Sequence, residues 1–171
     1  FDHRILEGMV VTLYVTVICM AFGAILATLL AIMKLSQNPI QRWLATGFNE
    51  FFRGTPLLLQ IVFWGYLGII FPQLVLGVPY TDIVFLSGDT SDLIPALVAG
   101  IIALSLNEAA YSAEIVRAGI LAINKGQKEA ASSIGLTPNQ VLKLVIMPQA
   151  LRIIIPPTTN QYLNLTKNSS L

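Results

Sequence analysis

The chain has 171 residues, of which 55% are hydrophobic and 11% are charged. Because soluble domains carry roughly a quarter of charged residues, this composition excludes an ordinary soluble protein and indicates a chain that lies mostly in lipid. The formal net charge of +1 gives no basis for a nucleic-acid partner, and the single cysteine, Cys19, excludes a disulfide or a thiolate metal cluster within this sequence.

The first predicted element is a membrane-spanning helix over residues 9–33. This stretch contains no charged residue and is long enough to cross a hydrocarbon core of about 30 Å. Within it, small residues recur at every fourth position, at Gly23, Ala27 and Ala31. That spacing places them on one face and predicts close packing against another helix.

A second predicted span covers residues 56–71. Before it, apolar residues at helical spacing among polar ones over residues 34–52 predict an amphipathic helix at the membrane surface. Thr55 and Pro56 then form a helix start, because a hydroxyl can cap free N–H groups and proline fits the first helical position.

The next segment, residues 72–93, is rich in Pro, Gly and Asp and contains Asp82 but no Lys or Arg. It predicts an irregular loop, with a course that dips back toward the membrane as one option. A third span is expected over residues 94–123. It begins near Pro95, and Lys125 and Gly126 follow its end.

Residues 125–147 predict two short helices joined by a tight turn at Gly135, and a fourth apolar span over residues 148–165 follows. Pro156 and Pro157 should interrupt the backbone hydrogen bonding of this span. Broken helices are tolerated at membrane depth where they line a cavity.

Basic residues are distributed unevenly between the predicted loops. They occur between the first two spans and after the third, at Lys34, Arg42, Arg53, Arg117, Lys125, Lys128 and Lys143. The positive-inside rule makes these loops cytoplasmic and the N-terminus of this region external. The segments together predict an all-α, polytopic membrane helix bundle that forms a single domain over residues 1–171, with a fifth span expected after residue 171.

The cytoplasmic loop at 125–147 is the first candidate functional region. Glu129 offers a charge, Ala130 and Ala131 permit close approach, and Gly135 allows the chain to reverse. These residues leave two interpretations open: a helix that docks on another protein, or a simple interfacial loop.

Polar side chains at membrane depth are the second candidate region. Burial of the Glu108 carboxylate in lipid costs at least a few kcal/mol, so it should face protein or water. The polar run that ends at Gln161 follows the expected proline break, where freed carbonyls could meet a substrate. For Glu108 and for the polar run alike, two roles remain open: lining a permeation path, or making purely structural hydrogen bonds. The substrate-path candidates are Thr55, Gln60, Asn107, Glu108, Thr159, Asn160 and Gln161.

Several chemistries have no matching residues in the sequence. No Gly-x-x-x-x-Gly-Lys-[Ser/Thr] loop is present, so this chain is not expected to bind ATP in the usual way. Neither a Gly-x-Ser-x-Gly nor a His-Glu-x-x-His motif occurs, and His3 is the only histidine. A membrane protease or metalloenzyme is therefore not expected, and neither is a metal site.

Four motifs occur in the order found in one known family. They are FRGTPLL at Phe52–Leu58, NEAAY at Asn107–Tyr111, EAASSIG at Glu129–Gly135 and PQALR at Pro148–Arg152. They are spread along the chain from Phe52 to Arg152. They resemble the membrane permeases of ABC importers for polar amino acids, and the third is similar to the EAA loop of that family.

The resemblance implies a type I importer permease fold whose cytoplasmic coupling helix, with Glu129, Ala130, Ala131 and Gly135, contacts an ATPase subunit. It implies a path for polar L-amino acids in a bacterial inner membrane, a second permease subunit, an external binding protein, and ATP with Mg²⁺ on the ATPase. Neutral amides at Gln161 and Asn168, where many relatives carry a carboxylate, argue against a strictly cationic substrate. Alternatives are an ABC permease for another small solute, and an ion-coupled carrier or channel.

Overall fold

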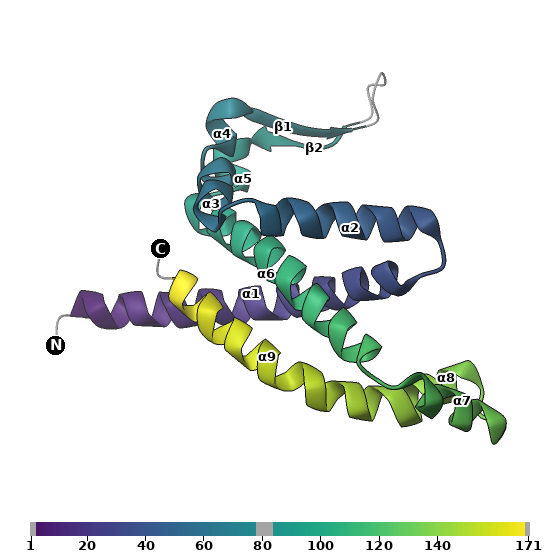
Figure 1. Cartoon of the computed structure of the whole chain (residues 1–171). Helices are drawn as coiled ribbons and strands as arrows, with labels where there is room; N and C mark the ends of the chain where they lie inside the picture. The colour runs from purple at the N-terminus through teal and green to yellow at the C-terminus, as the bar shows by residue number, and fades with distance from the viewer. Residues whose placement is uncertain (1–2, 78–83, 170–171) are drawn as a thin grey trace.

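The structure, a computed structural model, describes residues 3–77 and 84–169. Three long helices form its frame, α1 (His3–Leu35), α6 (Ala96–Leu121) and α9 (Met147–Asn168), and α6 packs against both of the others (Figure 1). Within the described residues, three helical segments are long and apolar enough to cross a membrane: His3–Leu35, Ala96–Leu121 and Pro138–Asn168. The prediction of a helical membrane bundle is confirmed, with one small hairpin as the exception.

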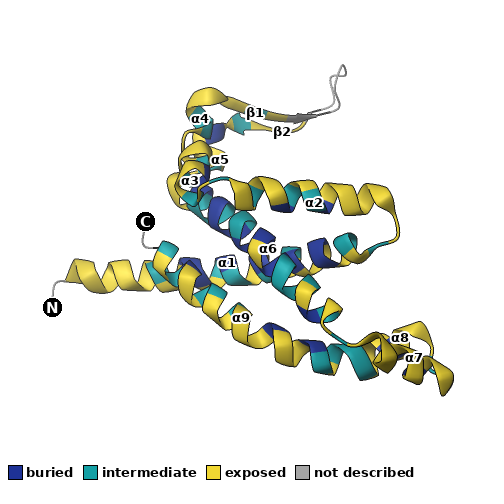
Figure 2. Ribbon diagram, in the orientation of Figure 1, coloured by how far each residue is buried: buried dark blue, intermediate teal, exposed yellow. Residues whose placement is uncertain are grey.

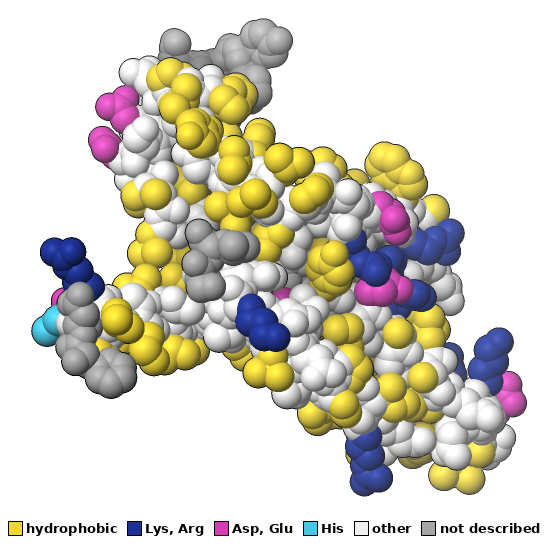
Figure 3. Space-filling view, turned by 60° about the vertical axis from the view of Figure 1, so that its left-hand side comes forward, with side chains coloured by type: hydrophobic (Ala, Val, Ile, Leu, Met, Phe, Trp, Pro, Cys, Tyr) yellow, Lys and Arg dark blue, Asp and Glu magenta, His cyan; other side chains and the backbone are white. Residues whose placement is uncertain are grey.

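The core lies where α1 crosses α6, because both helices present small side chains there. Gly23, Ala27 and Ala31 of α1 are buried, and so are Ala109 and Ala113 of α6 (Figure 2). The small side chains at these positions let the two helix backbones approach closely, as the four-residue spacing in α1 predicts. The opposite side of α1 remains apolar and exposed, and Figure 3 shows hydrophobic side chains spread over the visible face. Such a surface suits lipid.

Helix α2 (Pro39–Gly54) begins where the Asn38 side chain accepts a hydrogen bond of 2.9 Å from the Ile40 backbone N–H. It packs on α1 and α6 through the small or polar residues Ala45 and Asn49. The predicted amphipathic pattern is present. Phe48 packs against the core between α1 and α6, whereas other large apolar side chains point away from the rest of the chain, with Trp43 76% exposed. They are available to lipid or to another protein.

The predicted span over residues 56–71 is divided in the structure. It consists of α3 (Leu57–Gly65) with 9 residues and α4 (Leu67–Ile70) with 4 residues, on either side of Tyr66. At about 1.5 Å of rise per residue, neither helix alone crosses a hydrocarbon core of about 30 Å.

An antiparallel hairpin replaces the predicted irregular loop. Strand β1 (Gln73–Gly77) pairs with β2 (Val84–Asp89), so that Gln73 lies opposite Asp89. The segment between the strands, including Asp82, lies outside the described residues. The two short strands satisfy each other's backbone groups, and the high Pro and Gly content of residues 72–93 gave no strand pattern in the sequence.

Helix α5 (Thr90–Leu93) joins the hairpin to α6. The Thr90 side chain is buried, and its hydroxyl donates a hydrogen bond to the Phe71 carbonyl. Its backbone N–H donates to the Pro72 carbonyl at 3.0 Å. These bonds close the base of the hairpin.

The C-terminal half contains α7 (Lys125–Ser133), α8 (Pro138–Gln140), the π-helical turn η1 (Val141–Ile146) and α9. The predicted interruption at Pro156 and Pro157 is wrong, because α9 continues through both prolines. Two prolines remove two N–H donors, but the bonds on either side remain. The hydroxyls of Thr158 and Thr159 also donate to the Ile154 and Ile155 carbonyls, at 2.8 and 3.0 Å. The irregular backbone lies earlier instead, in η1.

Candidate functional site

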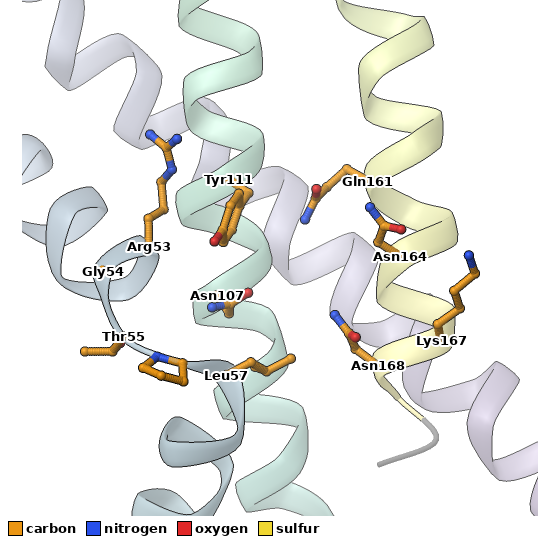
Figure 4. Close-up of a pocket in the computed structure, with 11 residues that line it drawn as sticks. Arg53, Gly54, Thr55, Leu57, Asn107, Tyr111, Gln161, Asn164, Lys167 and Asn168 are labelled. Carbon is orange, nitrogen blue, oxygen red and sulfur yellow. The ribbon is translucent and has the colours of Figure 1, made fainter.

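An open cavity of about 560 Å³ lies between the α2–α3 junction, α6 and α9 (Figure 4). Its lining consists of Arg53, Gly54, Thr55, Pro56, Leu57, Asn107, Tyr111, Gln161, Asn164, Lys167 and Asn168. Four of these residues carry side-chain amides and two carry cations. No carboxylate is among these lining residues, so the site favours a ligand with an anionic group and hydrogen-bonding groups.

The α2–α3 junction forms one wall because the helix ends there and the chain turns. Thr55 adopts an extended conformation, with φ −106° and ψ 137°, directly before Pro56. The Gln60 amide nitrogen donates to the Phe52 carbonyl at 2.9 Å, to the Thr55 carbonyl at 3.0 Å and to the Thr55 hydroxyl at 2.8 Å. Gln60 thereby satisfies carbonyls that the end of α2 leaves without helical partners.

Helix α6 forms the central wall. The Asn107 amide nitrogen donates to the Phe52 carbonyl at 3.2 Å and to Gln60 Oε1 at 3.3 Å. With the nitrogen engaged, Asn107 Oδ1 points toward the α9 side of the cavity (Figure 4). One turn later, the Tyr111 ring lies 5.3 Å from Arg53 Cζ, a cation–π contact that holds the guanidinium near the rim.

Helix α9 forms the facing wall with a stripe of amides. Gln161, Asn164 and Asn168 recur at i, i+3 and i+7, which places them on one face of the helix. Lys167 adds a positive charge beside them. The cavity therefore has a cation on each side, Arg53 from α2 and Lys167 from α9.

Glu108 lies behind this cavity. It is 1% exposed, and its two oxygens accept hydrogen bonds from Ser112 Oγ at 2.5 Å and from Gln161 Nε2 at 3.0 Å. The second bond joins α6 to α9 directly at the cavity wall.

The structure brings three of the seven predicted path residues to the cavity, namely Thr55, Asn107 and Gln161. Gln60 and Glu108 are buried behind it, each hydrogen-bonded to a lining residue. Thr159 and Asn160 are exposed and lie outside the cavity lining. Their positions on α9 follow from helical rotation, because residues one or two before Gln161 face other directions.

Five polar or aromatic lining residues were not among the predicted path candidates: Arg53, Tyr111, Asn164, Lys167 and Asn168, although the sequence had already linked Asn168 to the charge of the substrate. A signal for three of them was present. Tyr111 is four residues after Asn107, and Asn164 and Asn168 share a helical face with Gln161, so extension of each candidate by helical spacing would have found them. Arg53 and Lys167 required the tertiary arrangement.

The predicted coupling loop lies at the far end of the molecule from the hairpin (Figure 1). Asn124 Oδ1 caps α7 by accepting from the Gly126 N–H at 2.8 Å, and Gly135 adopts φ +87° as the chain reverses. Glu129 and Ala130 are exposed. Ala131 is 5% exposed, in a helix that packs against η1, so its small size serves packing within the loop rather than contact with a partner. A surface depression of about 510 Å³ is lined by Lys125, Lys128, Glu129, Ser132 and Ser133.

The fold and these two sites define a membrane permease domain of the ABC-importer type. Residues 10–171 match the family described as binding-protein-dependent transport system inner membrane component, and the chain belongs to this family. The arginine transport system permease protein ArgU of Corynebacterium glutamicum is 40% identical over 171 residues, and the chain spans 52% of its length. The arginine transport system permease protein ArtQ of Bacillus subtilis is 40% identical over 98% of the chain, which covers 68% of that protein.

Solved structures give the same family and fold. The structure resembles that of an amino acid ABC transporter with histidines, with a TM-score of 0.77 and 34% identity over 96% of this chain and 68% of that one. It also shares its fold with the MetNI methionine ABC transporter in an inward-facing conformation, with a TM-score of 0.72 and 19% identity over 99% of this chain and 74% of that one. The sequence-based assignment to the amino-acid ABC permeases is confirmed.

Proposed function

We propose that this chain forms the translocation path of an ATP-driven importer for polar L-amino acids, and that the cavity between the α2–α3 junction, α6 and α9 binds the amino acid. The lining of this cavity is the observation that carries the proposal: amides and two cations, with no carboxylate among its residues. An α-carboxylate would pair with Arg53 or Lys167, and the amide oxygens would accept hydrogen bonds from the α-ammonium group.

Neutral amides at Gln161, Asn164 and Asn168 support a polar amino acid rather than an exclusively cationic one. A cation-selective channel would be expected to place carboxylates or carbonyl rings along its path, and positive charges at the cavity oppose that function. The relatives include arginine and glutamine transport system permeases, which supports an amino-acid substrate.

The exposed surface of α7 is the proposed contact with an ATPase subunit, on which ATP and Mg²⁺ would be bound. Glu129 and the neighbouring serines present polar groups there, and Gly135 sets the direction in which the chain leaves. The remaining partners are a second permease subunit and an external binding protein. In this arrangement α7 faces the cytoplasm of a bacterial inner membrane and the N-terminus of the region is external.

The test is amino-acid uptake by the full-length permease, reconstituted in liposomes with its ATPase and binding protein. Glu129→Ala should lower ATP-dependent uptake, whereas Glu7→Ala, which removes an exposed carboxylate from α1, should leave it unchanged. Asn164→Ala should weaken substrate affinity instead. Uptake that proceeds equally without ATP would favour an ion-coupled carrier and contradict the proposal.

A further inference from the structure

A buried carboxylate contacts the cavity through a single lining residue. Glu108 is 1% exposed and is not part of the cavity lining, but its Oε2 accepts the Gln161 Nε2 hydrogen bond at 3.0 Å. Its Oε1 accepts from Ser112 Oγ at 2.5 Å. Both oxygens of Glu108 are therefore occupied by hydrogen bonds, one to Ser112 on its own helix and one to Gln161 on α9.

This contact fixes which end of the Gln161 amide faces the substrate. A carboxylate can only accept hydrogen bonds, so it selects the NH₂ end of the amide, and the carbonyl oxygen must point elsewhere. Without such a partner, a glutamine can present either its donor or its acceptor end to a ligand. Glu108 removes that choice.

The carboxylate itself is held in place from a third helix. A Cβ atom on Gly23 of α1 would lie 2.8 Å from Glu108 Cγ and 3.2 Å from its Cβ. The Glu108 side chain thus occupies the space that the missing Gly23 side chain leaves, between α1, α6 and α9. It cannot swing toward α1.

A second amide is oriented in the same sense. Both N–H donors of the Asn107 amide are engaged by the Phe52 carbonyl and Gln60 Oε1, so Asn107 presents its oxygen to the cavity.

We propose that Glu108 is a positioning residue that turns the Gln161 carbonyl oxygen into the cavity. Together with Asn107, it makes this part of the site accept hydrogen bonds from an ammonium group of the substrate. This proposal rests on the proposed amino-acid site.

The competing role for Glu108 is a structural bond between α6 and α9. Glu108→Gln separates the two roles, because two facing amides can still hydrogen-bond to each other but no longer dictate which end of Gln161 meets the substrate. A structural role predicts no change in substrate affinity. An orienting role predicts weaker binding with little change in thermal stability.

The experiment measures the Kd of labelled glutamine, and the Km and maximal rate of its uptake, in the reconstituted transporter. Glu108→Gln should raise Kd and Km by about tenfold, the factor that corresponds to about 1.4 kcal/mol, with a maximal rate and unfolding temperature near those of the parent. The double variant Glu108→Gln with Gln161→Glu exchanges the two groups. It again places an acceptor oxygen in the cavity and should restore Kd.

An unchanged Kd in Glu108→Gln would overturn the positioning role. If that variant fails to assemble, the exchanged pair decides: a Kd near the parent value supports the proposal and a weakened one overturns it. Gln161→Ala and Asn164→Ala distinguish the two levels of inference. If these two variants bind glutamine normally, the cavity is not the substrate site and the proposed function fails with it. If they bind weakly while Glu108→Gln does not, only the role of Glu108 fails.

Discussion

Gly119 of α6 lies directly against Ile154 of α9, since a Cβ atom on the glycine would be 2.3 Å from Ile154 Cγ1 and 3.1 Å from its Cδ1. Both residues are buried. The two helices that face each other across the cavity therefore meet at a point that has no room for a methyl group.

Gly119→Ala should push α9 away from α6 and destabilise the domain by about 1–3 kcal/mol, the usual cost of overpacking. Gly100→Ala is the matched control, because it lies in the same helix with nothing within 4 Å of its added Cβ. Thermal unfolding of the purified transporter in detergent measures the difference. Equal unfolding temperatures for the two variants would contradict the close contact.

The ion pairs of Glu114 tie the end of α1 to α6. Glu114 accepts from Lys34 Nζ at 2.9 Å and also pairs with Arg117 on its own helix. Because the Lys34 side chain is only 11% exposed, Glu114→Gln should cost more than loss of a surface pair, about 1–3 kcal/mol. The control is Glu7→Gln, which removes the highly exposed pair with His3. A loss of stability no larger than that of the control would show that the Lys34 pair is not structural.

Asn49 is fully buried in α2, and neither its amide nitrogen nor its oxygen has a hydrogen-bond partner among the described residues. A buried amide without partners costs about 1–3 kcal/mol. Asn49→Leu keeps the number and branching of the side-chain heavy atoms and removes the two polar ones, so it should raise the unfolding temperature of the chain. A lowered temperature would indicate that Asn49 finds a partner in the assembled transporter. Ala45→Ser, on the same face, controls for the effect of polarity.

Gly135 is the one described glycine with a positive φ, at +87°. Gly135→Ala should strain the turn after α7 by about 1–2 kcal/mol and change the direction of the loop. The expected result is a lower rate of substrate-stimulated ATP hydrolysis while the amino-acid Kd stays constant. Gly47→Ala provides the control, because Gly47 lies in α2 with open space around its position. Equal hydrolysis rates in the two variants would contradict a role for the turn in coupling.

Local sequence patterns predicted most of the helices, but the structure differs over the 56–71 span, the hairpin and the prolines of α9. The uncharged stretch of α1 and the Asn-Lys-Gly start of α7 are encoded by neighbouring residues. The hairpin was missed because its pairing joins Gln73 to Asp89 across a turn-rich segment. The continuous α9 was missed because proline weakens a helix only locally, and nearby hydrogen bonds and packing can maintain it.

The sequence by itself determined the membrane class and the family, because both depend on composition or on motifs of contiguous residues. The same motifs predicted the position of the coupling loop. Only the tertiary structure decided the cavity. Arg53, Asn107 and Gln161 belong to three different helices. The packing of α2 and α9 against α6 brings them together. The Glu108–Gln161 bond has the same origin. Helical periodicity fixes which face a side chain occupies, but the packing of whole helices fixes which faces meet.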